Sequence, residues 1–441
     1  MCQLTILLSL LFLFFTLSYT VTINTIAYYQ NGAGETIGLM VDKFNNYASE
    51  NNLDIDLNLV YFGKTNSSET FEFYESFIES HFKKEFDKYE LIFLNDLTIG
   101  TFGEHLLDLS DFVSKDLRKL YSGKSYYEHC FYKDKWISLP IFLDLTVLYS
   151  NDFLLKKYNK SLPKTWDELI ETSKYIIDEE QKLGNSIIGY NGLFYDGEGG
   201  VCSIYEFINS FRKSKDDGFP KADSEEFASA LKMMKKIKEE VSNDEQFQKN
   251  EVNYEEYLYT NNYVFSKFWY IPDTVLNSDK KISLLPGRTS ELSGSIVGSN
   301  GLGINKYVTD ESKRKAATEI IKYFSSVEFQ KEMVMAYQLP TGISSLYDDE
   351  EVCGKVDCEM FKGFQMIARP SARIENYEAY SQEFRKNVYG YLYGDNTIED
   401  TIAKITESEK YYISSANSRV KNFSLYLFSV MLSFLLYIIA F

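Results

Sequence analysis

Strand-like and helix-like patterns alternate in the early part of the chain, and this alternation limits the fold more than any other feature. Residues 21–29 and 53–62 alternate apolar and polar side chains as strands do, whereas residues 35–52 carry apolar side chains at helical spacing. An amphipathic pattern covers 69–86, and the uninterrupted apolar run 90–94 is typical of a strand buried in a parallel sheet. This order predicts an α/β fold.

The same mixture of patterns continues through the rest of the chain, which at 441 residues is long enough for two or three domains. Residues 136–149 contain two strand-like runs, around Pro140 and Asp144, and residues 287–303 are rich in Gly and Ser. Helical patterns are predicted at 165–183, 203–213, 224–241 and 311–336.

Two uncharged apolar segments near the ends of the sequence indicate the compartment. Residues 4–17 are followed by the small residues Ser18 and Thr20, which predicts a secretory signal peptide over 1–20. Residues 423–441 are also uncharged and follow small residues at 414–418, so they predict either a GPI attachment signal or a single transmembrane helix. We therefore expect a protein secreted to the extracellular side and tethered to the cell membrane.

The cysteines and sequons fit this compartment. Removal of the signal peptide leaves four cysteines, of which Cys353 and Cys358 are the favoured disulfide pair. For Cys130 and Cys202, a bridge and two buried thiols remain equally open. Asn66 and Asn159 begin N-x-S/T sequons and are candidate glycosylation sites, whereas Asn422 adjoins the apolar segment and is expected to stay unmodified.

Charge and motif content exclude several functions. A formal net charge of −18 without a basic block argues against nucleic-acid binding. Only three histidines are present, and neither HExxH nor paired CxxC spacing occurs, so zinc or serine hydrolase chemistry is disfavoured. We expect neither a metal nor a cofactor. Carboxylate pairs suited to glycoside hydrolysis are not excluded, because 64 acidic residues allow many pairs.

Several segments carry a resemblance to a known family. The run LPKTWDEL at 162–169 places Thr165 to cap a helix, with Asp167 and Glu168 in its first turn. The same run resembles the hallmark of family 1 extracellular solute-binding proteins, the maltose-binding-protein-like group that serves bacterial ABC importers. Segments 134–152, 296–340 and 369–405 resemble other parts of that family in the same order.

The resemblance implies two discontinuous α/β lobes joined by hinge crossovers, the type II periplasmic binding protein or venus-flytrap fold. On this basis we expect lobe 1 to comprise 21–143 plus 287–339, and lobe 2 to comprise 144–286 plus 340–415. The chain would cross between lobes near Leu143, Pro286 and Pro340.

Ligands of open α/β sheets bind beyond the carboxyl ends of strands, so strand-end and loop residues are the candidate contacts. An aromatic, carboxylate and amide lining suits a carbohydrate, and 195–207 resembles a segment of trehalose- and maltose-type binders, with an apparent insertion and Phe207 in place of Trp. The candidates are Tyr29, Gln30, Asn31, Glu35, Asn95, Asp96, Asp144, Asp196, Glu198, Glu206, Trp269, Tyr270, Asn300 and Tyr377.

These observations favour a non-catalytic binding protein that captures an oligosaccharide by lobe closure at the cell surface, for uptake or sensing. A membrane receptor or transport partner would then bind the closed conformation. Two alternatives stay open. The same fold could bind a polyamine or another small solute, which unpartnered carboxylates would favour. A glycoside hydrolase would need two suitably spaced carboxyl groups in the cleft.

Overall fold

The computed structural model describes residues 20–29, 33–63, 71–95, 97–121, 130–272, 279–374 and 376–412. The apolar segment 423–441 and all but the last residue of the predicted signal peptide lie outside these ranges. Within them, no helix is both long enough and apolar enough to cross a lipid bilayer.

The first half of the molecule is built on three strands, β1 (Val21–Tyr29), β2 (Ile55–Gly63) and β3 (Leu91–Leu94). Strand β1 pairs in parallel with both β2 and β3. The helices α2 (Ala33–Glu50) and α3 (Phe71–Lys83) lie between these strands along the chain. The predicted strand–helix–strand order is therefore confirmed.

Alternate residues of β3 enter two different cores, as the two-residue period of a strand requires. Leu91 and Phe93 pack in a core with α2, α14 (Glu311–Phe324) and α15 (Val327–Tyr337). Ile92 and Leu94 pack in a second core with α3 and α4 (Ile99–Phe102). Both faces of the strand are buried, which explains its uninterrupted apolar sequence.

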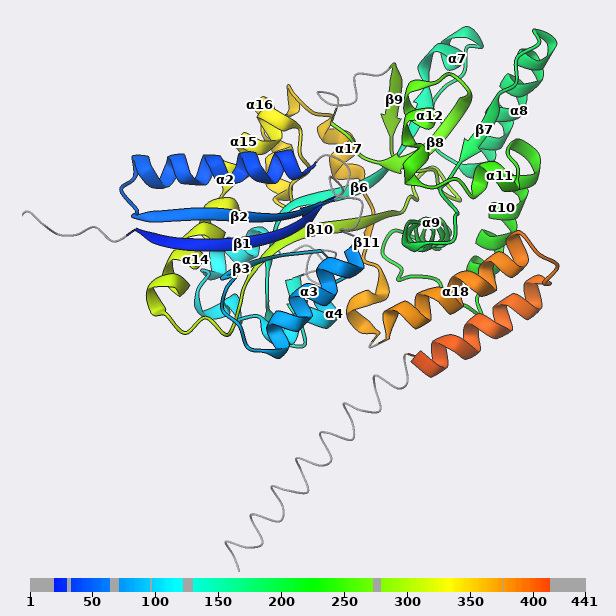
Figure 1. Cartoon of the computed structure of the whole chain (residues 1–441). Coiled ribbons are helices and arrows are strands. Elements are labelled where there is room, and N and C mark those ends of the chain that lie inside the picture. The colour runs from blue at the N-terminus through cyan, green and yellow to red at the C-terminus, as the bar shows by residue number, and fades with distance from the viewer. Residues whose placement is uncertain are drawn as a thin grey trace, which may run out of the picture.

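Two long strands, β6 (Leu139–Asn151) and β10 (Ser295–Ile304), connect the halves, as Figure 1 shows. The first part of β6 pairs with β10, and its second part pairs with β8 (Tyr263–Trp269) and β9 (Lys280–Ser283) of the second half. The Leu143 N–H also donates to the Pro340 carbonyl oxygen at 2.9 Å.

The two strand-like runs predicted around Pro140 and Asp144 form this single strand β6. Pro140 has no N–H to donate, and it pairs with Gly301 where the β10 register shifts between Asn300 and Gly301. Such an irregularity accommodates a proline without ending the strand.

The second half continues the same sheet. Within the described residues the sheet has nine strands in the order β2-β1-β3-β10-β6-β8-β7, with β11 (Met366–Ile367) beside β10 and β9 beside β6. Strand β7 (Ile188–Asn191) pairs in parallel with β8. The surrounding helices are α7 (Asp152–Lys157), α8 (Trp166–Lys182), α9 (Glu198–Asn209), α10 (Glu225–Val241), α11 (Asp244–Phe247), α12 (Tyr254–Tyr259) and α18 (Tyr377–Leu392), followed by a helical segment at 398–412.

Local signals account for most helix ends. Thr165 caps the start of α8 as predicted, and with Glu168 it forms a capping box. The predicted helix 311–336 is two helices, because Ser326 caps a new helix by accepting a hydrogen bond from the Phe329 N–H at 3.2 Å. Helix α9 begins at Glu198, earlier than the predicted start at 203. The sequence pattern missed its first turn because Gly199 and Gly200 there have low helix propensity.

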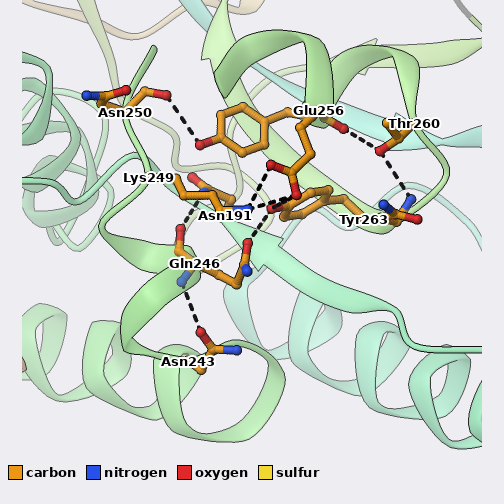
Figure 2. A network of polar contacts seen from close by, with 10 residues as sticks. Asn191, Asn243, Gln246, Lys249, Asn250, Glu256, Thr260 and Tyr263 are labelled. Atoms are coloured by element: carbon orange, nitrogen blue, oxygen red, sulfur yellow. Dashed lines mark hydrogen bonds and ion pairs between the residues drawn. The ribbon is translucent and has the colours of Figure 1, made fainter. Parts of the chain in front are cut away.

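A polar network anchors the outer end of β8 (Figure 2). Lys249 forms an ion pair with Glu256 at 2.7 Å. The Tyr263 hydroxyl lies within hydrogen-bond reach of Gln246 and Glu256, and the Asn191 amide donates to the Gln246 carbonyl oxygen. These contacts fasten α11 and α12 to the first residue of the strand.

A small core at the junction of the halves packs β6 and β10 against α16 (Glu350–Cys353) and α17 (Cys358–Gly363). A disulfide joins Cys353 to Cys358, with an S–S distance of 2.06 Å. Ile343 and Leu346 pack in the first-half core, although they lie after residue 339, in the segment predicted to belong to the second lobe.

The other two cysteines are not joined. Cys130 and Cys202 are separate buried thiols, and Cys202 lies in the second-half core. Burial raises the pKa of the Cys130 thiol to about 12. Shorter elements complete the described chain: α5 (Lys115–Leu120), β4 (Phe131–Tyr132), β5 (Lys135–Trp136) and the 3-10 turn η5 (Pro370–Arg373).

Candidate ligand-binding site

Strand register places several polar and aromatic side chains on one face of the sheet at the junction. Asp144 lies opposite Gly298, and Thr146 lies opposite Trp269. Lys267 is two residues before Trp269 on β8. Alternate residues and directly opposed partners share a face, so Asp144, Thr146, Lys267 and Trp269 all project to the same side.

Asp144 and Asn300 are brought together at the crossing strands. The Asn300 side-chain amide donates to Asp144 Oδ2 at 2.9 Å. A Cβ at position 298 would lie 3.1 Å from the Asp144 Cβ, so Gly298 leaves room for the carboxylate. Asp144 is the one residue of β6 that is not fully buried, which makes it accessible from the junction.

Glu206, predicted as a solute contact, is buried and has its partners within the protein. Its carboxylate accepts from the Thr146 hydroxyl and from the Ile296 N–H at 2.8 Å, and its second oxygen lies 3.2 Å from the Lys267 ammonium. Both charged side chains are only 2% exposed. Burial raises the pKa of the Glu206 carboxyl, while Lys267 opposes that shift.

Helix α9 lines the junction with residues spaced one turn apart. Glu198, Cys202 and Glu206 recur every four residues and therefore share a helix face. Burial raises the pKa of the Cys202 thiol, and Arg369, Glu198, Lys267 and Glu206 are all close enough to perturb it. Two charge pairs thus flank this thiol.

The Arg369–Glu198 ion pair also includes Tyr377. Arg369, which is 8% exposed, lies 3.0 Å from Glu198 Oε1. The Tyr377 hydroxyl donates to the same oxygen, and the Ser381 hydroxyl donates to the other at 3.2 Å. Burial, and then the Glu198 carboxylate, raise the pKa of Tyr377.

Asp196 lies at the exposed edge of this group. Its carboxylate is 79% exposed and is 2.7 Å from Arg385 Nε. The same arginine also donates to the Ser381 hydroxyl at 2.5 Å. Asp196 therefore extends the Glu198 cluster outward through Ser381 and Arg385.

Trp269 and Tyr270 have different surroundings although they are neighbours. The half-buried Trp269 ring lies at the carboxyl end of β8, with the Lys267 ammonium 5.5 Å from its centroid. Tyr270 packs edge-on against Phe361 at 5.4 Å, and its N–H donates to the Leu145 carbonyl oxygen at 2.7 Å. Trp269 is thus the better placed of the two for a solute.

The first half contributes fewer described contacts. The Asn95 side chain accepts from the N–H groups of Leu97 and Thr98 at 3.0 and 3.2 Å, so it stabilises its own turn. A Cβ at Gly100 of α4 would lie 3.4 Å from the Ser371 carbonyl oxygen of η5, which brings this half against the segment that carries Arg369. Gln30, Asn31 and Asp96 lie outside the described residues, as do the side chains of Tyr29 and Glu35.

Two features of the sequence were missed. Lys267 interrupts an otherwise apolar strand pattern, and a lysine in such a strand signals a buried ion pair. Arg369 follows a two-residue strand, which offers no clear pattern in sequence. Of the two candidate glycosylation sites, Asn159 is exposed, and Asn66 lies outside the described ranges.

Two surface pockets lie away from this junction. One, of about 430 Å³, lies between α18 and the helical segment 398–412. The other, of about 630 Å³, lies between α2, α14 and α15. In the described part of the chain, no three His, Cys, Asp or Glu side chains gather in a way that could hold a metal ion.

Solved structures of known proteins share this architecture. Maltose-bound MalE3 of T. maritima is 22% identical, with a TM-score of 0.69 over 88% of this chain and 99% of that one. The GacH receptor of Streptomyces glaucescens is 15% identical, with a TM-score of 0.69 over 89% of this chain and 98% of the other. At these identities the likeness establishes the fold, two α/β lobes joined by crossing strands.

Sequence comparison gives the family. A probable ABC transporter-binding protein of Deinococcus radiodurans is 24% identical over 310 residues, which cover 66% of this chain and 72% of that protein. Residues 93–357, more than half of the chain, match the model of the bacterial extracellular solute-binding proteins. The chain therefore belongs to the bacterial extracellular solute-binding protein family and has the maltose-binding-protein-like, type II periplasmic binding fold.

Proposed function

We propose that the protein binds a neutral, polyhydroxylated solute, an oligosaccharide, between its two lobes outside the cell. One observation carries the choice of ligand. The four carboxylates predicted to contact the solute and described at the junction each have a nitrogen partner: Asn300 for Asp144, Arg369 for Glu198, Arg385 for Asp196 and Lys267 for Glu206. The cationic partners of Glu198, Asp196 and Glu206 balance their charges, whereas the neutral Asn300 amide leaves Asp144 as a charged acceptor for a sugar hydroxyl.

This pairing argues against a polyamine ligand. A polyamine needs carboxylates whose charge is not already balanced, together with an aromatic box. Arg369 and Arg385 would repel an ammonium group placed near Glu198 or Asp196. The half-buried ring of Trp269, close to Asp144 on the same face, instead suits the apolar face of a pyranose.

We propose that binding proceeds by lobe closure and without catalysis. We take the lobes to be 21–143 with 287–339 and 144–286 with 340–415, with Ile343 and Leu346 reaching into the core of the first. The closed state is the one that holds solute. Glycoside hydrolysis needs one carboxyl group free to give a proton. Asp144 and Glu206 instead hold internal partners, and Glu206 is only 2% exposed. Closure would be reported to a transport or receptor partner in the membrane.

The test is thermal unfolding of the full-length protein in a detergent without a sugar head group. The panel contains maltose, trehalose, longer glucans, xylo-oligosaccharides, spermidine and amino acids. A solute that binds only the native state raises the melting temperature. We expect a rise with one sugar class that Trp269→Leu and Asp144→Ala each reduce. A rise with spermidine alone would replace the sugar by a cation, and the carboxylate argument would then be wrong.

The membrane tether is a second part of the proposal and rests on the apolar segment 423–441. Expression in a eukaryotic cell should place the protein in the membrane fraction, and deletion of that segment should release it to the medium. Phospholipase C specific for phosphatidylinositol would release a GPI-anchored form and leave a transmembrane form bound. Recovery of the intact chain in the medium would contradict the tether.

A further inference from the structure

Lys267 lies where a charged side chain is costly. It is in the middle of β8, a strand whose other residues are mostly apolar or aromatic, and its side chain is 2% exposed. Burial of an ammonium group is tolerated only with close partners. Lys267 has Glu206 at 3.2 Å and donates to the Ser203 hydroxyl at 2.9 Å. Both partners are on α9, so the pair fastens that helix to β8.

The same ammonium group also faces the Trp269 ring, 5.5 Å from the centroid. A cation at this distance is attracted to the face of an indole, and the attraction strengthens when water is excluded. Trp269 is the last residue of β8, is half-buried, and packs at the edge of two hydrophobic cores rather than inside one. The buried cation therefore restrains a ring that the core does not fully enclose.

The position of the cation is itself fixed at the hinge. Glu206 accepts hydrogen bonds from Thr146 on β6 and from the Ile296 N–H on β10, the two strands that cross between the halves. Ser295 adds a hydroxyl contact to Thr146 at 3.0 Å. The ring, the ammonium group, the carboxylate and both crossing strands thus form one connected unit.

We propose that the buried Glu206–Lys267 pair is a positioning unit that holds the Trp269 ring in the orientation in which it stacks on the solute. This inference rests on the proposed function, because it assigns Trp269 to the sugar. Glu206 and Lys267 do not touch the solute. They act through the ring, and they couple its orientation to the crossing strands.

The test variant is the double substitution Glu206→Gln with Lys267→Met in the full-length protein. It removes both charges together, so neither is left buried and unpaired, and it keeps an acceptor for Thr146 and Ile296. The matched control is Lys238→Met with Asp244→Asn. Lys238 is also a buried lysine of the second half, with its ammonium 2.5 Å from Asp244 and 5.3 Å from the Tyr393 ring centroid.

Affinity is measured by calorimetric titration with the sugar that most raises the melting temperature of the wild type. We expect the Glu206/Lys267 variant to bind about 10-fold more weakly and the Lys238/Asp244 control to bind like the wild type. The ligand-induced change in tryptophan fluorescence, taken as the difference from Trp269→Leu, should shrink in the first variant alone. A general loss of stability would not produce this selectivity.

A double-mutant cycle with Trp269→Leu decides between positioning and an independent effect. If the pair acts through the ring, the charge substitutions cost no further affinity once Trp269 is leucine. Fully multiplicative losses, or unchanged affinity in the Glu206/Lys267 variant, would overturn the inference while the proposed function stood. A wild type that binds no sugar would overturn both.

Discussion

Two lysine–glutamate pairs lie near opposite ends of strand β8, and their surroundings differ. At the outer end, Lys249 and Glu256 are 19% and 36% exposed and belong to the network of Figure 2. At the junction, Lys267 and Glu206 are each 2% exposed. Water can solvate either member of the outer pair if the other is lost. The inner pair has only the protein, so each member depends on the other.

The largest expected effect breaks the inner pair on one side. Lys267→Met leaves the Glu206 charge buried without its cation, so we expect the free energy of unfolding to fall by about 3–5 kcal/mol. Urea unfolding of the full-length protein followed by circular dichroism measures this loss.

The matched arm of that experiment adds Glu206→Gln to Lys267→Met. Removing both charges should recover most of the lost stability, because the cost is that of an unpaired charge rather than of the missing contact. Equal stability of the single and double variants would show that the inner pair does not depend on mutual compensation.

A smaller effect on stability is expected at Glu409, a partly buried acid that, unlike Glu206, has another carboxylate nearby. Burial, and then the nearby Asp223 carboxylate, raise the pKa of Glu409 to about 7 from the ordinary 4.5. The folded state therefore holds this proton more tightly than the unfolded chain, and stability is lost as pH rises from about 4.5 through about 7. Because Glu409 is partly exposed, we expect Glu409→Gln to add only about 1–2 kcal/mol at pH 8 and almost nothing near pH 4.

The control for this prediction is Glu407→Gln, since Glu407 is an exposed acid on the same helical segment. Urea midpoints at the two pH values give the comparison directly. A gain from Glu409→Gln that is equal at both pH values would remove the titration as its cause.

The smallest effect is expected at the outer pair. Lys249→Met removes an ion pair that remains in contact with solvent, and the loss should be about 0.5–1 kcal/mol. It should also diminish in 1 M salt, whereas the cost of Lys267→Met should not, because buried charges are poorly screened. Thermal unfolding at two salt concentrations tests both statements.

Patterns along the chain predicted the elements better than the contacts between them. The apolar run of β3 and the capping box of α8 are local features, and both were recognised in sequence. The pairing of Asp144 with Asn300 joins residues 156 positions apart, so only the register of β6 and β10 creates it.

The burial of Glu206 has a similar physical cause. Its place after the DGEGG loop, in a segment that resembles sugar binders, suggested contact with solute, but its charged partner is Lys267, on a strand distant in sequence. Lys267 contacts Ser203 and Glu206 of α9, and no spacing within 195–207 indicates which of its acids faces inward. The tertiary contact decides the role of each acid.

The register shift in β10 between Asn300 and Gly301 has a mechanical consequence. Such an irregularity bends the strand and increases its local twist, so we expect the proposed lobe closure to be absorbed first at this point. Asn300, whose amide holds Asp144, is one of the two residues at the shift. A solute that binds this amide would therefore contact the residue at which the two halves turn, so binding and closure would be coupled at a single position.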